Sequence, residues 1–221
     1  MPEKPLKIKV EDSEVSALWL APPKPRAALV LAHGAGTNMT HKSLAVIAEG
    51  LAERGIATLR YNFLYSERGS SRPDSPPRAH AAVRAAVSQA AKLTSKVPLF
   101  AGGRSFGGRM TSQAQALKPL PNVCGLIFFA FPLHPAGKPS DERAEHLFDV
   151  KVPMLFLQGT KDALAEPALL KPVIKKLGAR ATLKMLEGAD HSFHVAAKTG
   201  RKDADVLSEI LDTAAEWIAA H

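Results

Sequence analysis

The chain has 221 residues, 46% of them hydrophobic and 23% charged, which fits one globular domain with a sizeable core. The longest apolar stretch, residues 123–131, is far shorter than the ~20 residues of a membrane-spanning helix, and a single cysteine, Cys124, excludes a disulfide framework. The net charge of +8 comes from Lys and Arg spread along the chain without a nucleic-acid-binding motif, so we expect a basic, solvated surface and no nucleic-acid partner.

The predicted elements of the first half alternate between strands and helices. In chain order they are a hairpin of strands 6–10 and 15–20, a strand over 27–32, a helix from Thr40 to Arg54, a strand over 56–61 and a helix over 79–93. The run Ala27–Ala32 holds only aliphatic residues, as is typical of a strand buried on both faces. Residues 65–78 are rich in Ser, Pro, Arg and Gly and predict a loop.

The second half continues this alternation. In chain order its elements are a strand over 97–101, a helix over 109–117, a strand over 123–131, a polar segment over 132–150, a strand over 152–157, a helix over 167–178, a strand over 181–186 and a terminal helix capped by Asp203 or Asp205. The helix over 167–178 is expected to begin near Pro167 and to end at Gly178, and a split or a delayed start caused by Pro172 is the alternative. Cys124 lies within an apolar run, so we expect a buried, inert thiol.

Strands that alternate with helices predict βαβ units and an α/β fold, with a mostly parallel central sheet covered by helices on both faces. No internal repeat and no linker divides the chain, so we expect a single domain over residues 1–221. In such sheets the active site lies beyond the carboxyl ends of the strands. Each catalytic residue is therefore expected directly after a strand.

The predicted nucleophile lies in residues 102–108, GGRSFGG, between a predicted strand and a predicted helix. A G-x-S-x-G motif in this context is a nucleophile elbow, in which a strained turn lifts the serine hydroxyl clear of the sheet. Glycine is needed beside the serine because the strand and the helix approach closely there. The motif makes Ser105 the candidate nucleophile of a serine hydrolase.

A serine hydroxyl becomes a good nucleophile when a base takes its proton and a carboxylate orients that base. The candidate carboxylate is Asp162, which follows the penultimate strand in the segment QGTKD. Glu166 is the alternative. Asp190 is less favoured because it directly precedes the best candidate for the base.

The candidate base is His191, in the glycine-containing loop EGADHSF just past the last strand. His194 is the competing histidine. The chain order of Ser105, Asp162 and His191 is the order found in α/β-hydrolases, and it differs from the orders of chymotrypsin-type and subtilisin-type enzymes.

An oxyanion hole needs two backbone N–H groups directed at the developing negative charge. Phe106 is expected to provide one of them, because it follows the nucleophile at the N-terminus of a helix, where the dipole favours an anion. Ala35 is expected to provide the other from the sequence HGAG, with Gly36 as the second choice. His33 is expected to be structural and to form hydrogen bonds within this loop.

Two groups of basic residues lie near these candidates. They are Arg68, Arg72 and Arg78 in the loop over 65–78, and His134, Arg143 and His146 in the segment over 132–150. For the loop arginines a solvated loop is the favoured interpretation, and attraction of an anionic substrate is the alternative. For the second group, substrate contact and hydrogen bonding within the segment are both open.

The chain resembles the α/β-hydrolase superfamily over nearly its whole length. It is most similar to the small dienelactone-hydrolase-like branch that includes the testis-expressed hydrolase-like proteins and the hydrolase-like domain of a histone-acetyltransferase complex subunit. The residues that carry the resemblance are HGAG at 33–36, RYNF at 60–63, GGRSFGG at 102–108, FPLHPAGKP at 131–139, Arg143 with His146 and Leu147, QGTKD at 158–162 and GADHSF at 188–193.

This resemblance implies the roles of a catalytic triad for Ser105, Asp162 and His191, in a minimal enzyme without a large lid. One departure is that dienelactone hydrolases use cysteine as the nucleophile, whereas this chain has a serine. We therefore expect a serine hydrolase that acts on small carboxylic esters or thioesters through an acyl-enzyme. The alternative is a catalytically silent interaction module that keeps the α/β-hydrolase fold.

No cofactor or metal ion is expected. His33 and His41 lie eight residues apart without a carboxylate partner, and the remaining histidines lack the spacing of metal ligands. The first residues, MPEKPLKIKV, contain no apolar h-region of a secretory signal. A cytoplasmic protein without a membrane partner is therefore expected.

Overall fold

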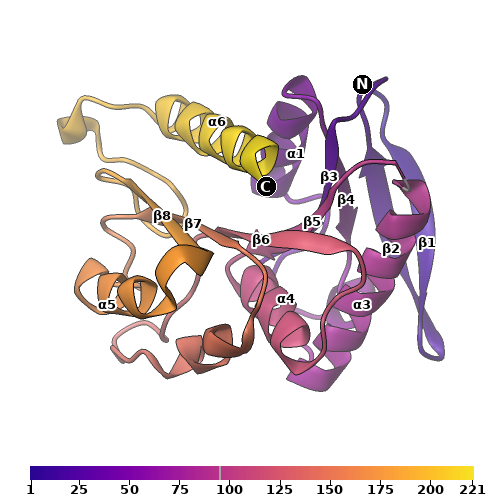
Figure 1. The fold of residues 1–221 in the computed structure, drawn as a ribbon, viewed down its shortest axis with the longest axis horizontal. Helices are drawn as coiled ribbons and strands as arrows, with labels where there is room; N and C mark the ends of the chain where they lie inside the picture. Colours follow the sequence, from indigo (N-terminus) through magenta and orange to yellow (C-terminus); the bar gives the residue numbers. More distant parts are fainter. Residues whose placement is uncertain (95) are drawn as a thin grey trace.

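A computed structural model describes residues 1–94 and 96–221, and within them eight strands form one sheet in the order β1-β2-β4-β3-β5-β6-β7-β8 (Figure 1). The hairpin strands are β1 (Lys4–Val10) and β2 (Ser13–Leu20), and β2 pairs antiparallel with β4. The parallel strands are β3 (Ala27–Ala32), β4 (Ile56–Tyr61), β5 (Leu99–Arg104), β6 (Val123–Phe129), β7 (Met154–Gly159) and β8 (Ala181–Leu186). The predicted α/β fold with a mostly parallel sheet is confirmed.

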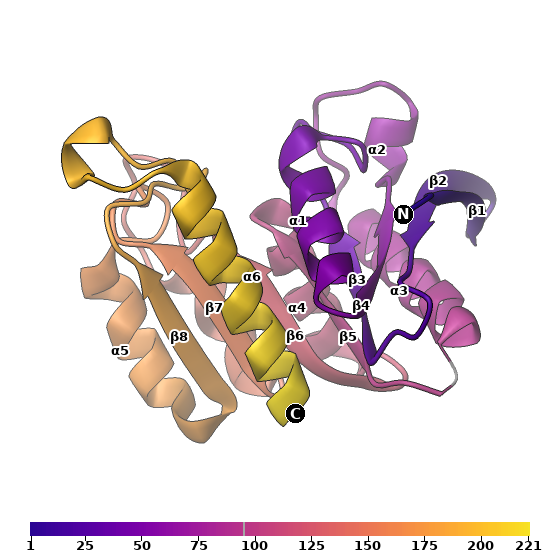
Figure 2. The ribbon, with the colours of Figure 1, turned by 90° about the horizontal axis from the view of Figure 1, so that it is seen from above.

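Helices cover both faces of the sheet. The described helices are α1 (Lys42–Glu53), α2 (Leu64–Glu67), α3 (Pro76–Leu93), α4 (Phe106–Leu117), α5 (Pro167–Leu177) and α6 (Asp203–Ala220), with short 3₁₀ segments at Glu142–Asp149, Gly178–Arg180 and Ala197–Thr199. Helices α1 and α6 lie on one face, whereas α3, α4 and α5 lie on the other (Figure 1). Seen from above, α6 runs along β6 and β7, and α1 is its neighbour on the same face (Figure 2).

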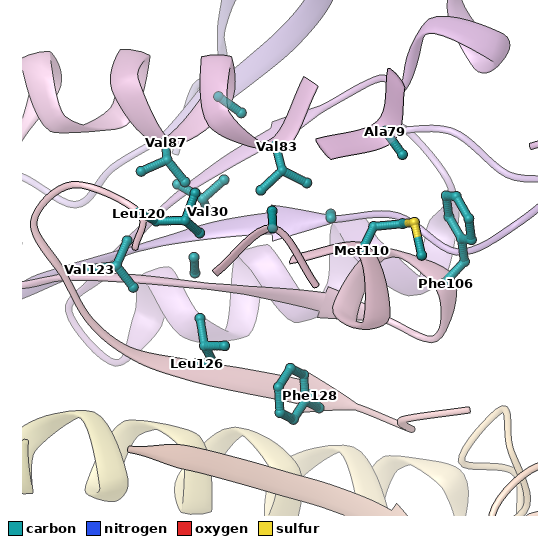
Figure 3. Close-up of a cluster of buried hydrophobic side chains, with 14 of the residues drawn as sticks. Val30, Ala79, Val83, Val87, Phe106, Met110, Leu120, Val123, Leu126 and Phe128 are labelled. Atoms are coloured by element: carbon teal, nitrogen blue, oxygen red, sulfur yellow. The ribbon is translucent and has the colours of Figure 1, made fainter. Parts of the chain in front are cut away.

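Alternate residues of β3 enter two different hydrophobic cores, because successive side chains of a strand point to opposite faces. Leu29 and Leu31 pack with the apolar residues of α1 and α6. Val30 points the other way, into the core formed with α3 and α4, where Val83 and Met110 also lie (Figure 3). This double burial explains why β3 contains only aliphatic residues.

Several predicted helix ends move by a few residues in the structure. Helix α1 begins at Lys42, and its N-cap is His41 rather than Thr40, because the His41 imidazole accepts a hydrogen bond from the Ser43 N–H. Helix α3 begins at Pro76, inside the predicted loop, since proline fits the first turn of a helix, where its missing N–H has no partner to lose. The same loop prediction missed α2.

Two further predictions about helices have mixed outcomes. Pro172 lies inside a continuous α5, so the alternative of a split or late start of this helix is wrong. The terminal helix begins at Asp203 and its N-cap is Lys202, so neither predicted aspartate is the N-cap residue. The Asp205 carboxylate accepts a hydrogen bond from the Lys202 N–H across the first turn (2.8 Å). Asp205 therefore caps this helix from inside its first turn.

The expected burial of Cys124 is wrong, because this residue is exposed. The register between β5 and β6 shifts at the start of β6, where Leu99 pairs with Val123 and Phe100 pairs with Gly125. Cys124 is thus the extra residue of a β-bulge. A bulge leaves one residue out of the regular alternation, so an apolar run does not guarantee burial at this position.

The segment between β6 and β7 is short and carries only the 3₁₀ helix Glu142–Asp149. In the described part of the chain, no large lid is inserted, as the resemblance implied. Among the helices of this part, none combines the length and the apolar character needed to cross a membrane.

Candidate active site

Three predicted site residues meet at the carboxyl end of the sheet. Ser105 follows β5, Asp162 lies beyond β7, and His191 lies beyond β8. The His191 Nε2 atom lies 2.8 Å from the Ser105 hydroxyl oxygen, and its Nδ1 atom lies 2.7 Å from a carboxylate oxygen of Asp162. The structure therefore brings these three side chains into one continuous chain of hydrogen bonds.

The buried Asp162 carboxylate decides which nitrogen of His191 carries a proton. Its Oδ1 atom accepts from the Leu164 N–H (2.8 Å), and its Oδ2 atom accepts from the side-chain amide of Gln158 (2.5 Å) and from His191. A carboxylate only accepts hydrogen bonds, so the imidazole donates from Nδ1. The Nε2 lone pair is then free to accept the proton of Ser105.

Gln158 is a positioning residue that the sequence did not single out. Its side-chain oxygen accepts from the Phe131 N–H (2.9 Å), which fixes the amide so that its nitrogen faces Asp162. Gln158 is the first residue of the QGTKD segment, so the sequence contained a signal for this residue. Only the pairing of Gln158 with the loop after β6 shows its role.

The alternative acid and base residues lie outside this chain of hydrogen bonds. The His194 side chain is exposed and pairs with Asp203 at 2.9 Å, and that pairing raises the pKa of His194. Glu166 is exposed at the N-cap of α5. The Asp190 carboxylate accepts the N–H groups of Ser192 and His194, so it shapes the turn that carries His191.

The backbone at Ser105 has φ +50° and ψ −115°, a strained conformation for a residue with a side chain. A Cβ atom on Gly103 would lie 2.5 Å from the Ala32 carbonyl oxygen, and one on Gly107 would lie 2.6 Å from the His33 carbonyl oxygen. Both motif glycines are thus required by the close approach of β5 and α4 to the end of β3. These features are those of a nucleophile elbow.

We expect Gly107→Ala to lower the free energy of unfolding by about 3 kcal/mol, because its methyl group forces backbone atoms apart in a packed region. Gly34→Ala is the matched control, since its Cβ would meet its nearest neighbour at an ordinary 3.7 Å. Urea denaturation of both variants measures the difference. Equal stability of the two variants would show that the close approach at Gly107 does not constrain the elbow.

The two predicted oxyanion donors flank Ser105. Phe106 is the first residue of α4, and Ala35 lies in the loop that follows β3. Within residues 1–94 and 96–221, neither N–H group donates to a protein acceptor. Both backbone donors are therefore available to a ligand oxygen at Ser105.

His33 is completely buried and spans two segments of the site. Its Nε2 atom accepts from the Phe63 N–H (3.1 Å), which leaves Nδ1 to donate to the Gly34 carbonyl (2.9 Å). Burial lowers the pKa of His33 to about 4. His33 is thus a neutral structural residue that ties the Ala35 loop to the end of β4, beyond the loop bonding expected from the sequence.

The low pKa of His33 predicts a loss of stability in mild acid. In the unfolded chain this imidazole binds a proton near pH 6.5, whereas in the folded protein it does so only near pH 4. As the pH is lowered from 6.5 to 4, the unfolded state therefore binds more protons, and the free energy of unfolding falls. Below that window its contribution is constant. His146, whose pKa is also lowered by burial to about 4, acts in the same direction.

Urea denaturation from pH 7.5 to about pH 4 measures this loss. We expect His33→Gln, which does not titrate, to lose less stability across the window than the wild-type protein. An unchanged slope in this variant would contradict the assignment to His33.

A cavity of about 360 Å³ opens beside the nucleophile. Its wall includes Ala35, Ser105, Phe106, Arg109, Arg143 and Leu164. Of the arginines and histidines in the two groups considered from the sequence, only Arg143 reaches this wall. The cavity has the size and position of a site for a small molecule.

The other arginine and histidine candidates lie elsewhere. Arg68 forms an ion pair with Asp74 at 3.0 Å, while Arg72 and Arg78 are exposed outside the cavity wall. His146 lies 2.7 Å from the Ser112 hydroxyl, and His134 is buried against the Pro135 carbonyl. In the described part of the chain, no group of three or more His, Cys, Asp and Glu side chains is arranged to hold a metal ion.

Comparison with known proteins gives the family of the chain. The family model described as an alpha/beta hydrolase domain matches residues 25–219. Dienelactone hydrolase from Anabaena variabilis superimposes with a TM-score of 0.80 at 19% identity, over 100% of this chain and 98% of that chain. A serine hydrolase without a lid from Xanthomonas campestris gives a TM-score of 0.77 at 22% identity, over 98% and 96%.

A third similar structure is Est1E from Butyrivibrio proteoclasticus with ferulic acid bound. It superimposes with a TM-score of 0.72 at 17% identity, over 94% of this chain and 98% of that chain. At these identities the three structures establish a shared fold. That fold is an α/β-hydrolase fold like that of dienelactone hydrolase.

Proposed function

The chain belongs to the α/β-hydrolase family, and on this basis we propose that it is a serine hydrolase that cleaves small carboxylic esters or thioesters through an acyl-enzyme. The observation that carries the proposal is the hydrogen-bonded chain of Ser105, His191 and Asp162 at the wall of a cavity. We also propose that residues 1–221 work as one domain, because β2 joins the N-terminal hairpin to the common sheet.

In the acylation half of the proposed reaction, the Ser105 oxygen attacks the substrate carbonyl carbon while His191 Nε2 takes the serine proton. The negative charge moves to the carbonyl oxygen, where the N–H groups of Phe106 and Ala35 stabilise it. Asp162 holds the imidazole in the required tautomer and stabilises its positive charge. When the carbon–oxygen or carbon–sulfur bond breaks, His191 returns the proton to the leaving alcohol or thiol.

Deacylation repeats these steps with water. His191 takes a proton from the attacking water, and a second tetrahedral intermediate forms on the acyl carbon. When its bond to the Ser105 oxygen breaks, the acid is released and His191 returns the proton to Ser105. No cofactor enters this scheme. The exposed mouth of the cavity and the short segment between β6 and β7 favour a substrate that reaches the serine without displacing a large lid.

The proposal is tested with a fluorophosphonate probe and a panel of esters and thioesters of graded acyl length. We expect the wild-type protein to be labelled on the peptide that contains Ser105 and to hydrolyse part of the panel, whereas Ser105→Ala does neither. Equal labelling or equal turnover of the two proteins would exclude Ser105 as the nucleophile. A protein with no turnover that retains a binding partner after Ser105→Ala would instead be an interaction module.

A further inference from the structure

Two arginines line the cavity beside Ser105. Arg109 lies one helical turn after Ser105, and its backbone N–H donates to the Ser105 carbonyl (3.1 Å). Arg143 comes from the start of the 3₁₀ helix between β6 and β7. Both side chains are half-buried, and they line the same cavity although one comes from α4 and the other from the segment between β6 and β7.

No carboxylate of the described residues neutralises either arginine. Neither guanidinium forms an ion pair in this part of the chain, and the Nε atom of Arg109 is buried without an acceptor. Burial lowers the pKa of both arginines, and the neighbouring charge of Arg143 lowers the pKa of Arg109 further. Two like charges therefore lie close together on the wall of one cavity.

The groups around Arg109 do not neutralise its charge. His80 and His146 are both close enough for the Arg109 charge to lower their pKa values. Asp74 is the carboxylate on the cavity wall, but it pairs with Arg68 and accepts the Tyr65 N–H. The remaining wall is mainly apolar, so the two guanidinium groups dominate the charge of the cavity.

Unpaired charges in a half-buried site are costly, because water solvates them poorly and no counter-ion compensates. An incoming anion removes this cost and is held more strongly than it would be in bulk water. The planar guanidinium group also matches a carboxylate with two parallel hydrogen bonds. The two guanidinium groups on the cavity wall thus match a carboxylate in charge and in geometry.

Resting on the proposed function, we propose that Arg109 and Arg143 form an anion subsite, and that the preferred substrates are esters bearing a carboxylate a few bonds from the scissile carbonyl. Because Arg109 is one helical turn from Ser105, an anion held there lies within a small molecule's length of the reacting carbon. The sequence left substrate contact open for Arg143 and suggested attraction of an anionic substrate for the loop arginines, whereas Arg109 was not singled out.

The kinetic test compares each charged ester with the same molecule in which the carboxylate is a methyl ester. Mono-(4-nitrophenyl) adipate and its methyl ester place the charge on the acyl side, and 4-acetoxybenzoate and its methyl ester place it on the leaving group. We expect wild-type kcat/KM to favour the charged member of at least one pair by tenfold or more, mainly through KM. The pair that shows the preference identifies the side of the scissile bond that faces the arginines.

We expect Arg109→Gln and Arg143→Gln each to lower the ratio of kcat/KM for the charged ester to kcat/KM for its methyl ester about tenfold. Each variant removes one guanidinium group, and with it two parallel hydrogen bonds to a carboxylate. A ratio cancels any general loss of activity. Arg78→Gln, which removes an exposed charge outside the cavity, is the matched control and should leave the ratio unchanged. Thermal melts check that each variant is folded. An equal drop in Arg78→Gln, or no drop in either cavity variant, would overturn the proposal.

Binding without turnover separates this inference from the proposed function. In a Ser105→Ala background, calorimetry with monomethyl adipate should give a Kd at least tenfold lower than with dimethyl adipate, and Arg109→Gln should abolish the difference. If no ester is hydrolysed but this difference is present, the subsite stands and the proposed hydrolase activity is wrong. If esters are hydrolysed and the difference is absent, the subsite is wrong and the hydrolase stands.

Discussion

Replacing His191 by alanine is expected to lower kcat by about 10⁵-fold or more on any ester that the wild-type protein hydrolyses. The Nε2 atom of His191, the proposed base, lies 2.8 Å from the Ser105 hydroxyl oxygen. Without it, the serine proton has no acceptor in acylation, and the leaving group has no proton donor. Single-turnover kinetics with a chromogenic ester measure the loss, with circular dichroism to confirm that the variant is folded.

The matched control is His194→Ala. This histidine lies three residues away in the same loop, but its side chain is exposed and pairs with Asp203. We expect its kcat to stay within about threefold of the wild-type value, as for a surface substitution away from the reacting atoms. A large loss in His194→Ala with little loss in His191→Ala would reverse the assignment of the base.

Replacing Asp162 by asparagine is expected to lower kcat by about 10³- to 10⁴-fold, with KM affected much less. Three donors converge on this carboxylate, from His191, Gln158 and the Leu164 N–H. An asparagine amide must turn its NH₂ group toward at least one of them, where two donors then repel. It also removes the negative charge that stabilises the imidazolium.

Glu166 provides the matched control for Asp162. Glu166→Gln changes an exposed acid four residues later, at the N-cap of α5, and should leave kcat nearly unchanged. The kcat of Gln158→Leu should lie between those of Asp162→Asn and Glu166→Gln, because this variant removes one of the three donors but keeps the carboxylate. If Glu166→Gln lost as much activity as Asp162→Asn, the acid would have to be reassigned.

The position of the candidate site could be predicted from the sequence because of the sheet. Strands of a parallel sheet end on the same side, so residues that follow different strands meet even when they are far apart in the chain. Ser105 and His191 are 86 residues apart, and their side chains are hydrogen-bonded. The chain order of the motifs and the strand before each of them were enough to predict this meeting.

The details that depend on side-chain direction could not be predicted in this way. Gln158 lies at the end of a buried strand, where its sequence neighbours do not reveal which way its amide points. Arg109 looks like an ordinary residue of a helix, and the cavity that it lines is formed by segments distant in the chain. The sequence shows which strand a residue follows, whereas its contacts depend on the packing of other elements.

Local backbone geometry accounts for the remaining differences. His41 replaces Thr40 as the cap of α1 because the imidazole can also accept from the first turn, which composition alone does not favour. Pro76 and Pro77 were grouped with a loop, although proline is suited to the first turn of a helix. In both places the residue type fits two local structures.

The bulge at the start of β6 gives the protein a practical property. It exposes the thiol of Cys124, the one cysteine in the sequence, at the amino end of a strand whose seven residues span about 20 Å. Ser105 lies at the opposite, carboxyl end of the same sheet. A maleimide dye or a surface tether can therefore be attached at a single native position, without mutagenesis, and immobilised molecules would present the substrate cavity to the solution.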